Sequence, residues 1–128
     1  FKNKRSSETI YTPHHGEART LLNHDFLDRF YAIKKLKDKY GGTWILKGAG
    51  TIILKKELFI NNFSNSILAT AGTGDVLSGI VGGLLCQNIS EPEIKGVQIH
   101  TTCAKNILNK KHETLIASDL IKEISKCV

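Results

Sequence analysis

The amino-terminal part of the chain alternates apolar and polar positions with two different periods. Residues 8–12 (ETIYT) alternate and carry β-branched and aromatic side chains, which predicts a short strand that stops at Pro13 and is followed by a loop. From about residue 25 to residue 40, apolar side chains recur at steps of three and four residues. This spacing predicts an amphipathic helix with a lysine-rich outer face, ended by the glycines at 41–42.

Three apolar runs come next in the sequence. Residues 43–47 (TWILK), 51–55 (TIILK) and 57–60 (ELFI) are rich in β-branched and large apolar side chains, and they predict three strands. Residues 48–50 (GAG) separate the first two of these strands. This part of the chain is therefore expected to form a sheet.

The remainder of the chain is predicted to be helical. Residues 61–72 are polar and irregular, and a small-residue helix is expected over residues 74–87. A second helix is expected from residue 92 or 93 to residue 109, and a third over residues 118–124. Strand, helix, strands and then helices imply one layered α/β domain, without an internal repeat or an interdomain linker.

The clearest chemistry lies in residues 68–87 (LATAGTGDVLSGIVGGLLCQ), where a glycine-rich turn passes into an apolar helix. The free N–H groups at a helix start, with the positive end of the helix dipole, form a site for a phosphate, and glycines let it approach the backbone. Gly72, Thr73 and Gly74 supply this start. Asp75 beside them would be able to accept the proton of a hydroxyl that attacks the phosphate.

Each of these residues also has a purely structural interpretation. Asp75 is typical of a helix N-cap, and the glycines before it are typical of a tight turn. Lys47 alone is typical of a solvated lysine at a strand end, residues 48–50 of a hairpin turn, and His14 and His15 of exposed turn residues. The residue types by themselves leave both interpretations open.

Three motifs, in the same order, resemble the ADP- or ATP-dependent NAD(P)H-hydrate dehydratases of the ribokinase-like superfamily. They are residues 12–17 (TPHHGE), 46–51 (LKGAGT) and 71–80 (AGTGDVLSGI). Residues 117–121 (ASDLI) and His100 also resemble the family's last helix and a helical histidine. The resemblance implies an α/β fold of the ribokinase-like three-layer α/β/α type, with residues 1–128 as the C-terminal part of a single domain and its N-terminal part missing.

The resemblance also implies roles for individual residues. Asp75 would be the catalytic residue and contact the substrate, and His14 would lie beside the hydrated nicotinamide. Mg²⁺ would accompany the ADP or ATP that serves as phosphoryl donor, whereas no protein metal site is expected, because His14, His15 and Glu17 have no fourth ligand at a telling spacing. The residues expected to bind the nucleotide are Lys47, Gly48, Ala49, Gly50, Thr51, Gly72, Thr73 and Gly74.

The activity implied is nucleotide-dependent dehydration of hydrated NAD(P)H back to NAD(P)H, a carbon–oxygen lyase reaction of metabolite repair. The expected partners are the hydrated cofactor and the adenine nucleotide, and the family tends to form homotetramers. A ribokinase-like kinase acting on a small alcohol and an inactive half-domain are the alternatives. Residues 65–68 (NSIL) replace a Gly- and Pro-containing turn that ends in Met, and Ala71 replaces a usual glycine, changes that would weaken nucleotide binding.

The composition limits which classes of protein and of partner remain possible. The 128 residues with 41% hydrophobic side chains fit one soluble domain, and the net charge of +6 favours anionic ligands. The lysines form no stripe interleaved with aromatics, so no nucleic-acid partner is expected. The apolar stretch 76–86 is too short to span a membrane, and three cysteines without a CxxC pair predict a reducing, cytoplasmic location. The absence of Met and the start at Phe1 predict a piece of a longer protein.

Several helical residues are expected to be structural. Cys86, Cys103 and His100 lie on apolar helix faces and are predicted to be core residues. The run of Gly79, Gly82 and Gly83 is predicted to permit close helix packing.

Overall fold

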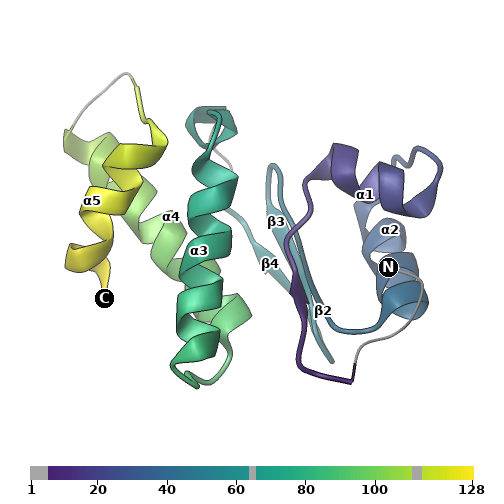
Figure 1. Cartoon of the computed structure of the whole chain (residues 1–128). Helices are drawn as coiled ribbons and strands as arrows, with labels where there is room; N and C mark the ends of the chain where they lie inside the picture. The colour runs from purple at the N-terminus through teal and green to yellow at the C-terminus, as the bar shows by residue number, and fades with distance from the viewer. Residues whose placement is uncertain (1–5, 64–65, 111–113) are drawn as a thin grey trace. The chain divides into compact units, whose positions relative to one another are not determined.

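The computed structural model describes residues 6–63, 66–110 and 114–128. They form a mixed α/β structure with a four-stranded sheet and five α-helices (Figure 1). The chain divides into two compact units, Phe1–Ser64 and Asn65–Val128. All the described strands belong to the first unit, and the described part of the second unit is helical. The predicted order of a strand, a helix, three strands and then three helices is confirmed, except that two helices lie between the first two strands where one was predicted.

The sheet of the first unit has the strand order β1-β2-β3-β4. Strand β1 pairs with β2 in parallel, whereas β2–β3 and β3–β4 are antiparallel. The parallel pair requires a crossover between β1 and β2, which the two helices of this unit supply. The strands are β1 (Ile10–Tyr11), β2 (Thr43–Leu46), β3 (Thr51–Leu54) and β4 (Leu58–Asn61).

Helices α1 (His15–Leu22) and α2 (Arg29–Tyr40) pack on one face of this sheet (Figure 1). Alternate residues of the strands face the helices, as the two-residue period of a strand requires. Trp44 is fully buried among them, stacks on Tyr11 with 4.2 Å between ring centroids, and donates from Nε1 to the carbonyl of Gly41 at 2.7 Å. The buried core comprises Ala18, Phe26, Ala32, Ile33, Leu36, Tyr40, Trp44, Leu46, Ile52 and Leu54.

Helix α1 contradicts the loop predicted after Pro13. A capping box starts the helix: His14 Nδ1 accepts from the backbone N–H of Glu17 at 3.2 Å, and a Glu17 carboxylate oxygen accepts from the N–H of His14 at 2.7 Å. Histidine is not among the usual N-cap residues, so the sequence pattern did not reveal this helix start.

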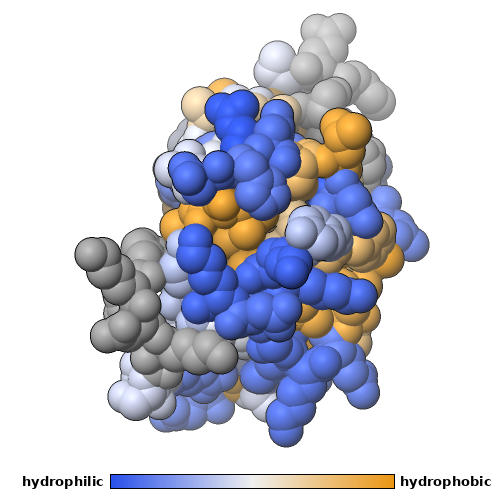
Figure 2. All heavy atoms as spheres, turned by 90° about the vertical axis from the view of Figure 1, so that its right-hand side faces the viewer, coloured by the Kyte–Doolittle hydropathy of each residue, from blue (hydrophilic) through white to orange (hydrophobic). Residues whose placement is uncertain are grey.

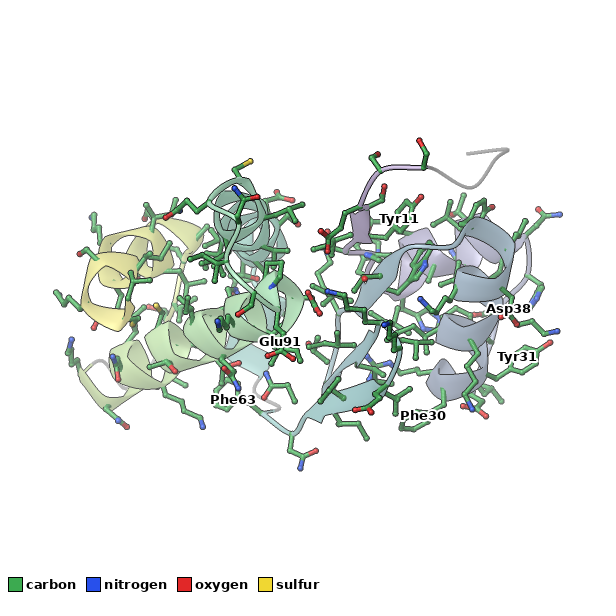
Figure 3. All side chains as sticks on the ribbon, turned by 90° about the horizontal axis from the view of Figure 1, so that it is seen from below. Tyr11, Phe30, Tyr31, Asp38, Phe63 and Glu91 are labelled. Carbon is green, nitrogen blue, oxygen red and sulfur yellow. The ribbon has the colours of Figure 1, made fainter. Side chains whose placement is uncertain are left out.

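Helix α2 starts later than the predicted residue 25. The side chain of Asp28 accepts from the N–H groups of Phe30 and Tyr31, which makes Asp28 the N-cap. Phe30 belonged to the predicted apolar periodicity, yet it remains 43% exposed, and Figure 3 labels it on α2 next to the exposed Tyr31. The predicted lysine-rich outer face is confirmed, since Lys34, Lys35 and Lys39 are exposed. Hydrophilic side chains predominate on the face shown in Figure 2.

The second unit consists of helices that pack on one another. The contacts between α3 and α4 and between α4 and α5 are the most extensive. Residues 65–68 are the segment that differs from the family's Gly- and Pro-containing turn. Asn65 lies outside the described residues, and the remainder of the segment falls in a short 3-10 helix. The elements are η1 (Ser66–Ala69), α3 (Thr73–Cys86), α4 (Pro92–Lys110) and α5 (Ala117–Cys127).

The glycine that allows close helix packing is Gly96 of α4, and not the predicted run in α3. A Cβ at Gly96 would lie 2.5 Å from Cγ2 of Val81, so α3 and α4 approach closely here. At Gly79, Gly82 and Gly83 an added Cβ would meet nothing within 4 Å in the described part of the chain. The prediction for these three glycines is therefore wrong for the packing described.

Two of the three predicted core residues are buried. Cys103 and His100 are buried in α4, as predicted, whereas Cys86 is exposed because it is the last residue of α3. Within the described ranges, no helix is both long and apolar enough to cross a membrane.

Candidate functional site

The predicted site residues fall into two groups, one in each unit. His14 and residues 47–51 belong to the first unit, and Gly72, Thr73, Gly74 and Asp75 belong to the second. Each group is organised by hydrogen bonds within its own unit.

In the second unit, Gly72 is the N-cap of α3 and adopts a left-handed conformation, with φ 84°. Ala117 packs against it, because a Cβ at Gly72 would lie 3.2 Å from the Cβ of Ala117. Thr73 is buried, and its hydroxyl donates to the carbonyls of Leu68 and Thr70 at 2.6 and 2.8 Å. These bonds fix the turn that leads into the helix.

The start of α3 has no side-chain cap. The N–H of Val76 donates to the carbonyl of Gly72 at 3.1 Å, and Gly72, the N-cap, has no side chain to accept from the first turn. Among the described residues, the N–H groups of Gly74 and Asp75 have no hydrogen-bond acceptor. Free amides at the positive end of a helix dipole are the arrangement that binds phosphate groups.

Asp75 lies in the first turn of α3, two residues after the first residue of the helix. Gly72 occupies the N-cap position, and Asp75 makes no side-chain cap hydrogen bond, so the interpretation of Asp75 as a mere N-cap is wrong. The residue is exposed, and it borders a cavity of about 870 Å³ together with Gly72 and Ala117. The carboxylate is therefore open to a molecule at the helix start.

This cavity continues from the helix start along α3 and α5. Beyond Asp75 its walls are mainly apolar, and the lack of side chains at Gly79 and Gly83 leaves space in it. Its other lining residues are Val76, Ile80, Leu84, Gln87, Ile99, Ile121, Ile124 and Val128. A polar end with free amides and a long apolar continuation suit a ligand with a phosphate at one end.

The first turn of α3 is supported from α4. The Nε2 atom of the buried His100 lies 2.9 Å from the carbonyl oxygen of Thr73. A carbonyl oxygen can only accept, so Nε2 of His100 carries a proton and donates it. His100 thus holds the α3 start from the inside, and this role was not predicted beyond its burial.

In the first unit, Lys47 connects two motifs that are far apart in the sequence. Its backbone N–H donates to the carbonyl of Pro13 at 2.9 Å, and its ammonium lies 4.0 Å from a carboxylate oxygen of Glu17. The Lys47 side chain is only 17% exposed, which contradicts its interpretation as a solvated lysine. Residues 12–17 and 46–51 therefore lie side by side.

His14 is held at the start of α1 with an exposed ring. Because Nδ1 accepts from the N–H of Glu17, the proton of the neutral ring lies on Nε2. The side chain is 60% exposed, as expected for a turn residue, and Nε2 lies 3.8 Å from the second carboxylate oxygen of Glu17. His14 can therefore present an N–H donor to a ligand.

The turn between β2 and β3 contains the predicted nucleotide residues 48–50. Gly48 and Gly50 have φ values of 152° and 67°, a region that side chains with a Cβ rarely adopt. Arg29, a residue that the sequence did not single out, donates to two carbonyls of this turn and to the carbonyl of Leu46 before it. No motif contains Arg29, and its position directly after the N-cap of α2 gives no signal of this contact.

Histidines and carboxylates of the α1 region do not converge on a metal. His15 Nε2 pairs with a carboxylate oxygen of Asp25 at 3.1 Å, and its ring packs on Phe26. No group of three or more His, Cys, Asp or Glu side chains in the described ranges could hold a metal ion. The imagined set His14, His15 and Glu17 is therefore not assembled as a metal site.

Comparison with known proteins identifies the family. The family model described as NAD(P)H-hydrate dehydratase matches residues 2–126. A bifunctional NAD(P)H-hydrate repair enzyme of Coxiella burnetii is 40% identical over 124 residues, which are 90% of this chain and 25% of that protein. The chain thus spans about a quarter of this curated relative.

Solved structures agree with this result. An ADP/ATP-dependent NAD(P)H-hydrate dehydratase of Bacillus subtilis, co-crystallised with ATP and Mg²⁺, superposes with a TM-score of 0.84 and 28% identity, over 97% of this chain and 49% of that one. A ribokinase-like superfamily protein of Enterococcus faecalis superposes with a TM-score of 0.74 and 25% identity, over 93% of this chain and 44% of that one. The fold is ribokinase-like, and the chain belongs to the NAD(P)H-hydrate dehydratase family.

Proposed function

We propose that this chain is part of an enzyme that removes water from hydrated NADH or NADPH at the expense of ADP or ATP. The start of α3 carries this proposal: the free amides of Gly74 and Asp75 lie beside an exposed carboxylate that borders a cavity. Membership of the dehydratase family supports the substrate class. The cysteine pattern favours a cytoplasmic protein, and the family resemblance favours a homo-oligomer.

In the proposed reaction, the hydroxyl of the hydrated nicotinamide ring attacks the terminal phosphoryl group of the nucleotide. Asp75 accepts the hydroxyl proton, the new O–P bond forms and the bond to the nucleotide breaks. Phosphate is a better leaving group than hydroxide. The lone pair of the ring nitrogen then expels phosphate, and loss of a proton from the neighbouring ring carbon restores the double bond.

The α3 amides would bind the charge that develops on the transferred phosphoryl group. Gly72, Thr73 and Gly74 shape this site, since the Thr73 hydroxyl bonds hold the turn and Gly72 adopts the left-handed conformation of the N-cap. One oriented donor of this kind typically lowers the barrier by about 3 kcal/mol. The preformed turn needs no reorganisation when charge develops.

The first unit would contribute contacts to substrate and nucleotide. His14, with its Nε2 proton and exposed ring, is proposed to donate to the hydrated nicotinamide. Residues 47–51 are proposed to contact the adenine nucleotide, with Lys47 attracting its phosphates. The Lys47 side chain is kept near the turn by Glu17 and by the hydrogen bond of its backbone to Pro13.

Mg²⁺ is proposed to enter with the nucleotide. Mg²⁺ usually binds through one or two carboxylates, phosphate oxygens and water, so it does not need a dedicated protein cage. We propose that phosphate oxygens and water hold the ion, and that the exposed Asp75 carboxylate stays free to accept the hydroxyl proton. When bound, the ion would neutralise phosphate charge.

The test is the variant Asp75→Asn, assayed with hydrated NADH and either ADP or ATP. The absorbance of the reduced nicotinamide should return with the unaltered protein and not with Asp75→Asn, while nucleotide binding is retained. Asp38→Asn, which changes an exposed carboxylate on α2, is the matched control and should keep the full rate (Figure 3).

Other outcomes would contradict the proposal in different ways. A wild-type rate for Asp75→Asn would exclude Asp75 as the base. A stable phosphate ester formed from a small alcohol, without activity on hydrated NADH, would identify a kinase. If the protein shows no activity and binds no nucleotide, it is an inactive half-domain.

A further inference from the structure

We propose that Arg29 is a positioning residue that holds the turn 48–50 in the conformation that receives the nucleotide. This inference rests on the proposed function, because it takes the nucleotide contact of this turn as its starting point.

The guanidinium group of Arg29 binds the turn at two points and the end of β2 at a third. Nη1 donates to the carbonyl oxygens of Ala49 and Gly50 at 2.7 and 2.8 Å, and Nη2 donates to the carbonyl oxygen of Leu46 at 3.0 Å. The guanidinium group is planar and presents its donors in a fixed arrangement, so it fixes three carbonyls relative to one another. A lysine ammonium, a single nitrogen, does not match this geometry.

The turn depends on an external support of this kind. Leu46 and Ile52 form the last pair between β2 and β3, and Thr51 pairs only with Asn61 of β4, so residues 48–50 lie outside the sheet ladder. Glycine at 48 and 50 permits the observed φ values, but it also gives the chain more freedom to leave them. A Cβ at Gly48 would lie 3.0 Å from Nη2 of Arg29, so the backbone packs directly against the guanidinium group.

Arg29 is itself held in place by its helix. It is the first residue of α2, whose N-cap is Asp28, and α2 packs on β2 and β3. The carboxylate of Asp28 accepts from the N–H groups of Phe30 and Tyr31. The turn is therefore anchored to a helix that belongs to the core of the first unit.

The positive charge of Arg29 is not neutralised by a carboxylate in the ion pairs of the described ranges. Among the ion pairs of the described ranges, none involves Arg29, and its donors go to carbonyl groups, which carry no net charge. A half-buried cation that is bound only through carbonyls makes the turn electropositive. This charge suits an approaching polyphosphate.

The test compares Arg29→Lys with Arg19→Lys, an exposed arginine on α1. Affinity for ADP with Mg²⁺ is measured by calorimetry, and amide hydrogen exchange is measured over residues 48–51 and over α2. For Arg29→Lys we expect about tenfold weaker ADP binding, the loss of roughly one charged hydrogen bond. We also expect faster exchange at 48–51, with α2 unchanged, whereas Arg19→Lys should match the unaltered protein.

Arg29→Ala gives a second measurement. Added ethylguanidinium should restore part of its ADP affinity, because the cation can occupy the space of the deleted group, and it should not change the affinity of Arg19→Ala. Restoration would support positioning by the guanidinium group, and its absence would contradict it.

Each contrary result would overturn a different part of the proposal. Wild-type ADP affinity in Arg29→Lys would overturn the role of Arg29 and leave the proposed function intact. Weaker binding without faster exchange at 48–51 would also overturn it, because the Arg29 guanidinium group would then contact the nucleotide directly and would not act by holding the turn. If the unaltered protein binds neither ADP nor ATP, the proposed function fails, and the role of Arg29 fails with it.

Discussion

The backbone N–H of Lys47 donates to the carbonyl of Pro13 at 2.9 Å and joins the end of β2 to the turn before α1. This bond ties Lys47, the residue that follows β2, to the residue before His14, the N-cap of α1. Glu17 adds to this connection, since its carboxylate accepts from the N–H of His14 and lies 4.0 Å from the Lys47 ammonium.

Replacement of Glu17 should separate its two contacts. Glu17→Ala removes the acceptor for the N–H of His14 and should reduce the free energy of unfolding by about 1 kcal/mol. Glu17→Gln keeps an acceptor oxygen and loses only a half-exposed ion pair, so it should cost less than about 0.5 kcal/mol. Denaturant titration measures both, with Glu57→Gln as an exposed control. Equal losses for the Ala and Gln variants would contradict the capping role.

His100→Ala should loosen the start of α3. The variant leaves the Thr73 carbonyl without its buried donor and deletes a buried ring, so we expect a loss of about 2–3 kcal/mol. Hydrogen exchange should increase first in the opening turn of α3. His24→Ala, at an exposed histidine, is the control. Unchanged exchange in that turn would mean that the hydrogen bond does not hold it.

Two glycines should respond in opposite directions to the same substitution. Gly96→Ala places a Cβ 2.5 Å from Cγ2 of Val81 and should destabilise the protein by about 1–3 kcal/mol. Gly82→Ala meets nothing within 4 Å in the described part of the chain and should stabilise α3 by about 0.5–1 kcal/mol. Thermal unfolding of the pair measures the difference. A destabilising Gly82→Ala would show that another surface covers this side of α3.

Acid should weaken the link between α4 and α5. Hydrogen bonds from Lys110 and Lys126 lower the pKa of Glu123 below its ordinary value of 4.5. A folded-state pKa below the unfolded one contributes stability that is complete above the unfolded value and is lost as the pH falls through the folded value. Stability should therefore decrease below about pH 4.5, and less steeply in Glu123→Gln. Identical pH profiles for the two proteins would exclude this contribution.

The local signals in the sequence determined the order of the elements and the chemistry of the α3 start. Periods of two and three to four residues identify strands and amphipathic helices because neighbouring side chains share a face. The glycine-rich entry to α3, with Asp75 in its first turn, was recognisable because helix-start signals lie within a few residues of one another. Helix α1 was missed because histidine is an unusual N-cap.

Only the tertiary structure decided which residues, distant in the sequence, hold the predicted turns and helix starts in place. The contacts of Arg29 with the turn 48–50, of Lys47 with Pro13, and of His100 with Thr73 join segments that no local pattern relates. The packing role of Gly96, against the open space at Gly82, was likewise settled by the way α4 lies on α3. Such contacts depend on how whole elements pack, and the periodicity of a single element carries no information about its partner.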